Sequence, residues 1–178
     1  MSNTYTYETH FEPYVKRFKE IIVPDEKVDR INNLVGNVVK AKASEQHHKV
    51  DGNQENKRFY TGFLGEAAVE VLLGRDVIDW SVGNSRIYNV PDINIDGKKV
   101  GVKTVEHGKF PVIFVKNSYP QIICVKTDIN RVLICGLASQ EILNKYQSSS
   151  LIIDPRLRNR GVKTGFYGFE YLKQFWQV

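Results

Sequence analysis

"PDINIDGKKVGVKT", residues 91–104, reads as two short strands joined by a turn, and this stretch decides the fold. The Asp-Gly pair at 96–97 stands between two runs in which polar and apolar residues alternate, which is a strong short-range signal of a β-hairpin. With these two residues as the loop, Ile95 pairs with Lys98, and each step outward adds one more pair. The sequence therefore predicts a hairpin with a fixed register.

The predicted hairpin has one polar and one apolar face, because successive strand residues point to opposite sides. In this register Asp92 lies opposite Gly101, within diagonal reach of Lys103. The polar face comprises Asp92, Asn94, Lys99, Gly101 and Lys103, and the apolar face comprises Ile93, Ile95, Val100 and Val102. Two interpretations stay open. Asp92 and Lys103 form a surface ion pair worth roughly 0–1 kcal/mol, or they form part of a functional site.

A carboxylate in an apolar helix favours the functional interpretation. Residues 59–74 predict a buried helix that ends at Gly74, and Glu66 lies among its apolar residues. A charged residue is rarely buried without a partner or a function. We expect Asp92 and Lys103 to project from one sheet face with Glu66 packed beside them, and Glu70 to lie at the solvent edge.

The remaining pattern predicts an α/β sandwich around a central mixed sheet. Helical spacing of apolar residues predicts a helix over 26–42, and the polar stretch 42–57 reads as a mobile connection or a surface loop. A further helix is expected at 139–146, followed by a basic loop. The predicted strands are 76–80, 86–95, 98–105, 111–116, 121–127 and 131–137.

Composition limits the class of protein. The chain has 178 residues, a formal charge of +5 and a pI near 9.1, which favours an anionic partner. Its polar start is not a signal peptide, and no apolar run is long enough to span a membrane. Cys124 and Cys135 each lie in an apolar run, so we expect buried, reduced thiols in a cytoplasmic protein.

Together, "GFLGEAAVEVLLG" and "VPDINIDGKKVGVKT" resemble the PD-(D/E)XK nuclease superfamily, which includes restriction endonucleases, Holliday junction resolvases and phage-encoded DNases. The resemblance covers roughly residues 59–137 and implies a restriction endonuclease-like sandwich with helices flanking the sheet. It also implies that Glu66, Asp92 and Lys103 are catalytic. Mg²⁺, or Mn²⁺ in its place, would be held by Glu66, Asp92 and the backbone carbonyl of Val102.

One position departs from the family pattern. Gly101 stands where the family has Asp or Glu, which removes a hard oxygen ligand and a negative charge. Glu66 is the expected substitute, because Glu106 points to the opposite face from Lys103. The resemblance implies a metal-dependent DNA endonuclease. The alternative is a catalytically inactive relative that binds nucleic acid or a protein. A basic α/β domain with no nucleic-acid role is a third possibility if the predicted register is wrong.

Basic residues supply candidate contacts to the phosphates of duplex or branched DNA. A solvated surface loop is the other interpretation of the basic stretch. The candidates are Lys98, Lys99, Lys109, Arg156, Arg158, Arg160 and Lys163. We expect an N-terminal helical extension with a polar connection over 1–52 and a nuclease-like core over 53–178. No membrane partner is expected, and a homodimer is an open possibility.

Overall fold

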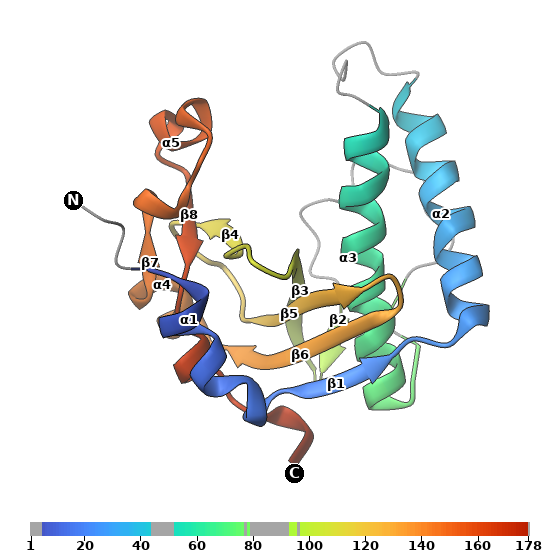
Figure 1. Cartoon of the computed structure of the whole chain (residues 1–178), viewed down its shortest axis with the longest axis horizontal. Helices are drawn as coiled ribbons and strands as arrows, with labels where there is room; N and C mark the ends of the chain where they lie inside the picture. Colours follow the sequence, from blue (N-terminus) through green and yellow to red (C-terminus); the bar gives the residue numbers. More distant parts are fainter. Residues whose placement is uncertain (1–4, 44–51, 77, 79–92, 96, 178) are drawn as a thin grey trace.

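The computed structural model describes residues 5–43, 52–76, 78, 93–95 and 97–177. It is an α/β protein with a curled, mixed five-stranded sheet in the order β1-β6-β5-β3-β2 and a smaller sheet in the order β4-β8-β7 (Figure 1). The strands are β1 Lys19–Ile22, β2 Ile93–Ile95, β3 Lys98–Glu106, β4 Val112–Phe114, β5 Gln121–Asp128, β6 Arg131–Ala138, β7 Gln147–Ser148 and β8 Lys163–Phe166. The helices are α1 Tyr7–His10, α2 Asp25–Ala43, α3 Gly52–Leu73, α4 Gln140–Lys145 and α5 Pro155–Arg160, with 3₁₀ turns at Glu12–Arg17, Ser149–Leu151, Phe169–Tyr171 and Phe175–Gln177.

The β2–β3 pair has the predicted register. Ile95 pairs with Lys98, and Ile93 pairs with Val100, in antiparallel orientation. Gly97 has a φ of 79°, the left-handed conformation that glycine adopts readily in a turn. On its other side β3 pairs with β5 in parallel, and β5 pairs with β6 in antiparallel. The sheet is therefore mixed, as the sequence predicts.

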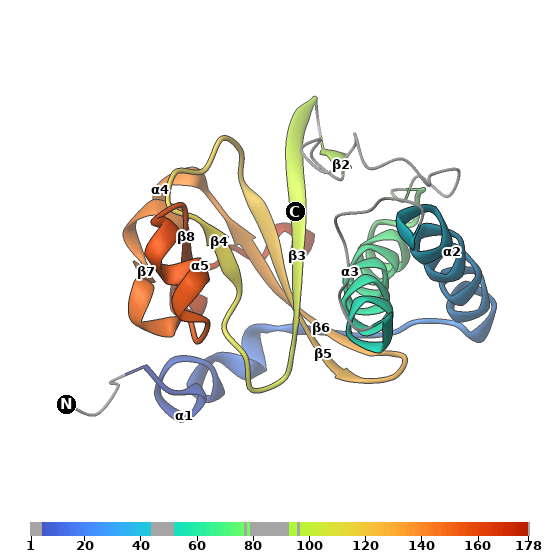
Figure 2. The ribbon, with the colours of Figure 1, turned by 90° about the horizontal axis from the view of Figure 1, so that it is seen from above.

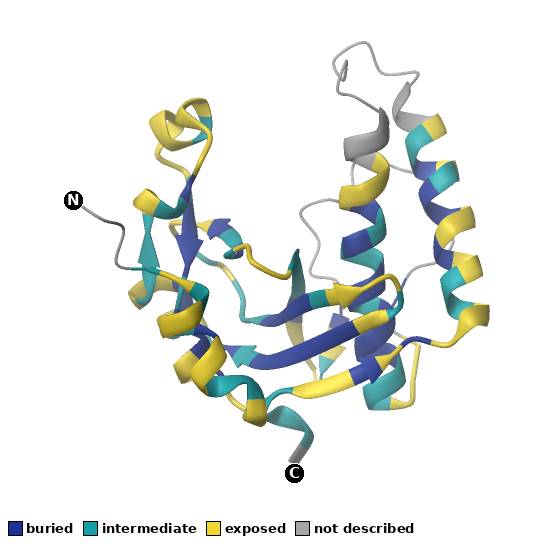
Figure 3. Cartoon of the chain, in the orientation of Figure 1, coloured by how far each residue is buried: buried dark blue, intermediate teal, exposed yellow. Residues whose placement is uncertain are grey.

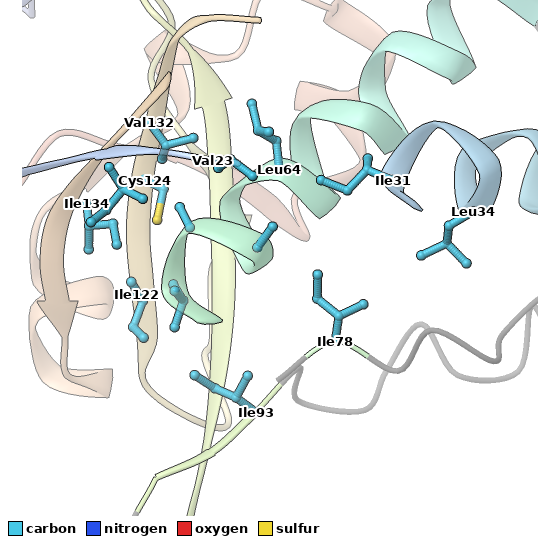
Figure 4. Close-up of a cluster of buried hydrophobic side chains, with 14 of the residues drawn as sticks. Val23, Ile31, Leu34, Leu64, Ile78, Ile93, Ile122, Cys124, Val132 and Ile134 are labelled. Atoms are coloured by element: carbon cyan, nitrogen blue, oxygen red, sulfur yellow. The ribbon is translucent and has the colours of Figure 1, made fainter. Parts of the chain in front are cut away.

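Helices α2 and α3 cover one face of the sheet. An acidic first turn begins α2 after Pro24, and its apolar residues pack with those of α3 over β3, β5 and β6 (Figure 4). The approach of α3 to β3 is close, since a Cβ built on Gly65 would lie 1.7 Å from Oγ1 of Thr104. Any side chain at position 65 would therefore push the helix away from the strand.

Helices were predicted to flank both faces of the sheet, but the opposite face is covered mainly by other elements. The small β4-β8-β7 sheet, α4 and the N-terminal turns pack against it. This second core is rich in aromatic residues, including the buried Phe11, Phe166 and Phe169. In Figure 2, β3 runs between α3 on one side and β4 and β8 on the other.

Three segments differ from the sequence prediction. Residues 52–57, expected in a loop, form the first turns of α3. Residues 155–160 form α5, and the strand β8 follows where the sequence predicts a basic loop. The strand β1 pairs with β6 and so brings part of the predicted N-terminal extension into the main sheet. The predicted strands at 76–80 and 86–95 lie mostly outside the described residues.

Two further expectations concern the cysteines and the membrane. Cys124 and Cys135 are free and buried, which confirms the prediction of buried thiols. Burial raises the pKa of both thiols. No helix in the described part of the chain is long and apolar enough to cross a membrane.

Candidate functional site

Lys103 lies on the face of β3 that points away from α3. The α3-facing residues of β3 include Thr104, which meets Gly65, and Glu106, whose Oε1 is 3.4 Å from Nζ of Lys57 on α3. Since strand residues alternate, Lys103 points to the other side. Its register partner on β5 is Ile123, a member of the second core. Lys103 is half-buried there.

Gly101 packs closely against two side chains, and the sequence does not predict this contact. A Cβ built on Gly101 would lie 2.9 Å from Cε2 of Tyr119 and 3.3 Å from Cγ of Gln121. Gln121 is the register partner of Gly101 on β5. The space beside Gly101, where the sequence resemblance predicts an acidic side chain, is therefore filled by Tyr119 and Gln121 rather than by Glu66. The carboxamide carbon of Gln121 lies 3.4 Å from the same Cβ position.

Glu66 lies on the α3-covered side of the sheet, where it is half-buried. The pKa of Cys124 on β5 is raised mainly by the burial of its thiol, and the negative charge of Glu66 raises it further. The carboxylate of Glu66 is therefore close to the sheet. Glu66 and Lys103 therefore start from opposite faces of the sheet, which differs from the expectation that Glu66 packs beside the face that carries Lys103. Beyond Val100, no strand in the described part of the chain pairs with the outer edge of β3.

Glu70 is buried, in contrast to the expectation that it lies at the solvent edge. Only 2% of its surface is exposed. Nζ of Lys27 on α2 lies 2.7 Å from its Oε1, and the backbone N–H of Ile78 donates to its Oε2 at 2.9 Å. The carboxylate therefore connects α3 to α2 and to the chain beyond α3. Sequence analysis could have found this residue from its apolar neighbours Ala67 and Val71, but not its partners.

Asp92 and Pro91 lie outside the described residues, as does Asp96 of the turn. Val102 is half-buried on the apolar face of β3, and its side chain packs against the core under α3. The assignment of Asp92 and of the Val102 carbonyl to a metal site therefore stays a prediction. Among the described residues, no three His, Cys, Asp or Glu side chains gather as they would around a metal ion.

The predicted nucleic-acid contacts fall into three groups. Lys98 and Lys99 are exposed at the turn end of β3, and Lys109 lies just beyond its other end. The two ends of β3 are separated by eight residue steps, or roughly 26 Å. Arg156, Arg158, Arg160 and Lys163 form the third group, on α5 and β8. The exposed surface of α5 stands away from the sheet in Figure 3.

The third group includes one arginine with a structural contact. Nε of Arg158 donates to the carbonyl of Ile152 at 3.2 Å, and its Nη2 donates to the same oxygen. Arg156 and Arg160 are exposed. Nζ of Lys163 lies 4.5 Å from the centre of the Phe114 ring, and burial, followed by the charge of Arg58, lowers the pKa of Lys163. Arg58 on α3 is therefore a further cation on this side of the molecule.

Three lysines that are far apart in the sequence lie close together around Glu106. Nζ of Lys57 lies 3.4 Å from a carboxylate oxygen of Glu106, and those of Lys109 and Lys126 each lie 3.9 Å from one. Of these lysines, only Lys109 is among the nucleic-acid contacts predicted from the sequence. The others lie on α3 and β5, so no local spacing in the sequence predicts that they meet.

Comparison with protein-family models, with curated proteins and with solved structures found no match to this chain.

Proposed function

We propose that the chain is a metal-dependent DNA endonuclease of the PD-(D/E)XK kind, which hydrolyses phosphodiester bonds. The observation that supports this most is the β2–β3 register, in which Ile95 pairs with Lys98. This register agrees with the one that the proposed site needs, in which the polar positions of the two strands share a face. The mixed sheet, with β3 parallel to β5 and α3 packed on one face, is compatible with a restriction endonuclease-like sandwich.

The proposed metal site uses oxygen donors. Glu66 and Asp92 would supply carboxylates, Val102 its carbonyl, and Gln121 the carboxamide that lies beside Gly101. Oxygen donors of this kind suit Mg²⁺ or Mn²⁺ better than a soft metal. Because Glu66 starts from the α3-covered face, the proposal requires its carboxylate to reach the site around the outer edge of β3.

Each residue would have a separate role in the reaction. Mg²⁺, when bound, supplies a Lewis acid that polarises the scissile phosphate and lowers the pKa of a bound water. Lys103 would place an ammonium next to the phosphate oxygens, where negative charge grows in the transition state. Gln121 would orient a neutral dipole towards the same place. A carboxamide carries no negative charge, so a high metal concentration is expected for activity.

The second candidate function is that of a nuclease-fold protein that binds nucleic acid without cleaving it. The packing at Gly101 favours this candidate, because Tyr119 and Gln121 fill the space of the missing acidic side chain. The surrounding cations would serve either function. The two candidates differ in whether phosphodiester bonds are broken.

Nicking of supercoiled plasmid and of branched DNA across a titration of Mg²⁺ and Mn²⁺ tests the proposal. We expect the parent to cleave and Asp92→Ala to lose cleavage. Lys145→Ala, which removes an exposed lysine above the ring of Tyr146 on α4, should cleave like the parent. Equal cleavage by the parent and Asp92→Ala would contradict the proposed site. A parent that binds DNA but cleaves none of these substrates would favour the second candidate.

A further inference from the structure

The lysines around Glu106 carry more positive charge than their carboxylate can neutralise. Lys57, Lys109 and Lys126 come from α3, from the turn after β3 and from β5. All three ammonium groups lie within 4 Å of the single carboxylate of Glu106. With ordinary charges on the four side chains, the cluster has a net charge of about +2. Like charges held this close together repel each other unless an anion lies between or beside them.

The carboxylate of Glu106 does not make all the hydrogen bonds that it could accept. Its side chain is 24% exposed, and its Oε1 is buried without a hydrogen bond from any described residue. The contacts from the three lysines are 3.4–3.9 Å long, longer than the 2.7–2.9 Å of a strong charge-assisted hydrogen bond. Glu106 therefore gathers the ammonium groups without using their donor capacity.

Two of the three lysines are accessible to a ligand. The side chains of Lys57 and Lys109 are 67% and 69% exposed, whereas that of Lys126 is only 17% exposed. Arg58 follows Lys57 on α3 and is exposed as well, and no carboxylate of the described residues pairs with it. The accessible side of the cluster is thus positive and rich in free N–H donors.

We propose that Lys57, Lys109 and Lys126, gathered by Glu106, form a phosphate-binding site for the backbone of a nucleic acid. This site lies at the end of β3 remote from the hairpin turn, and Lys98 and Lys99 lie at the other end. Along the strand Lys103 lies between these two ends, on the face opposite to Glu106. The inference rests on the proposed function in its choice of ligand, but it requires no cleavage. The effect of Arg58 on the pKa of Lys163 is consistent with a positive surface that extends towards β8.

Binding of a fluorescent DNA duplex in EDTA tests this inference, because no metal-dependent cleavage occurs there. We expect Lys57→Ala with Lys109→Ala to weaken binding about tenfold. The slope of log affinity against log salt should become shallower by about 1 for each lysine that contacts a phosphate. Lys145→Ala should change neither quantity by a comparable amount.

The decisive variant is Glu106→Gln. It removes the negative charge and keeps the shape, so a phosphate site should bind DNA several-fold more tightly and with a steeper salt slope. Glu20→Gln is the matched control, since Glu20 lies 3.8 Å from Arg131 on the β1 side of the same sheet. We expect no comparable change from Glu20→Gln. Urea unfolding of each variant verifies that its fold is retained.

Other results would overturn the inference. If Glu106→Gln and the double lysine variant both bind DNA like the parent, the cluster is a structural ion-pair network only. Displacement of DNA by poly-L-glutamate at equal charge concentration would indicate an acidic polypeptide as the ligand instead. Loss of cleavage in Asp92→Ala with unchanged binding by the lysine variants would retain the nuclease proposal and reject this site. Binding that depends on the lysines, without any cleavage, would retain this site and reject the nuclease proposal.

Discussion

The strand β3 and the basic segment at 154–163 carry the two main sets of candidate residues, and they differ in how their positions arise. In β3 the local turn that contains Gly97 sets the register, and alternation then decides which face each side chain occupies. The basic segment is a short helix followed by a strand, and β8 pairs with β4 and β7. Its cations are therefore placed by long-range pairing.

In the proposed function, β3 carries a residue that takes part in the reaction, and α5 carries residues that bind DNA. Lys103 is half-buried on a fixed strand, as a residue that stabilises a transition state should be. Arg156 and Arg160 are exposed on a six-residue helix, as residues that attract a phosphate backbone can be. Substitutions in β3 should therefore change cleavage or stability strongly, whereas those in α5 should change affinity slightly.

The largest effect is expected from Lys103→Ala. Removing the ammonium should lower the single-turnover rate of plasmid nicking by about 10²–10³-fold, because charge on the phosphate oxygens loses its stabilisation. Binding of the same DNA in EDTA should fall by no more than a few-fold, since one phosphate contact is lost. If binding and cleavage fall equally, Lys103 only binds DNA. Its role would then be the same as that proposed for the arginines of α5.

Gly101→Ala is expected to lower the free energy of unfolding by about 1–3 kcal/mol. Its Cβ would lie 2.9 Å from the half-buried ring of Tyr119, which must shift. Gly36→Ala on α2 is the control, because nothing lies within 4 Å of its Cβ position, and a helical alanine should be as stable as glycine or more so. Urea unfolding of both variants measures the difference, and equal stability would show that Tyr119 accommodates a side chain at position 101.

Gln121→Glu should lower the Mg²⁺ concentration needed for half-maximal cleavage by about tenfold, because a carboxylate replaces a neutral amide at the same position. The substitution keeps the length of the side chain and so avoids the contact that Gly101→Glu would make with Tyr119. Cleavage across a metal titration measures it. An unchanged metal requirement would mean that Gln121 fills space beside Gly101 without binding the metal.

The smallest effects are expected in α5. Arg156→Ala with Arg160→Ala should weaken DNA binding only a few-fold and reduce the salt slope by at most about 2. Arg158→Ala should instead lower the free energy of unfolding by about 1 kcal/mol, because it loses the hydrogen bonds to Ile152. Anisotropy titrations and urea unfolding separate the two effects. Destabilisation by all three substitutions alike would reject this division of α5.

Local signals predicted much of the fold. The turn at 96–97 predicted the hairpin register, and apolar spacing predicted α2 and most of α3. The helix α5 was missed although its signals are present: Asp154 caps the helix, Pro155 begins it, and Gly161 ends it with a φ of 69°. The prediction gave more weight to the charges of this segment than to its helix boundaries.

The candidate site was less predictable because its contacts cross between elements. Tyr119 and Gln121 reach Gly101 from β5 and the segment before it, across a parallel pairing that no local pattern specifies. The same holds for Glu70, whose partner Lys27 comes from α2, and for the lysines that meet at Glu106. Residue types alone could indicate that these side chains are polar, but not which of them meet.

The most direct test of the proposed metal site is anomalous diffraction from crystals of the protein soaked with Mn²⁺. The account predicts a peak about 2.0–2.2 Å from carboxylate oxygens of both Asp92 and Glu66, with the carbonyl of Val102 as a further ligand. Crystals of Asp92→Ala should lack this peak under the same soak. A peak that persists in Asp92→Ala, or Mn²⁺ bound only at sites that exclude both carboxylates, would contradict the claim that these residues hold the catalytic metal.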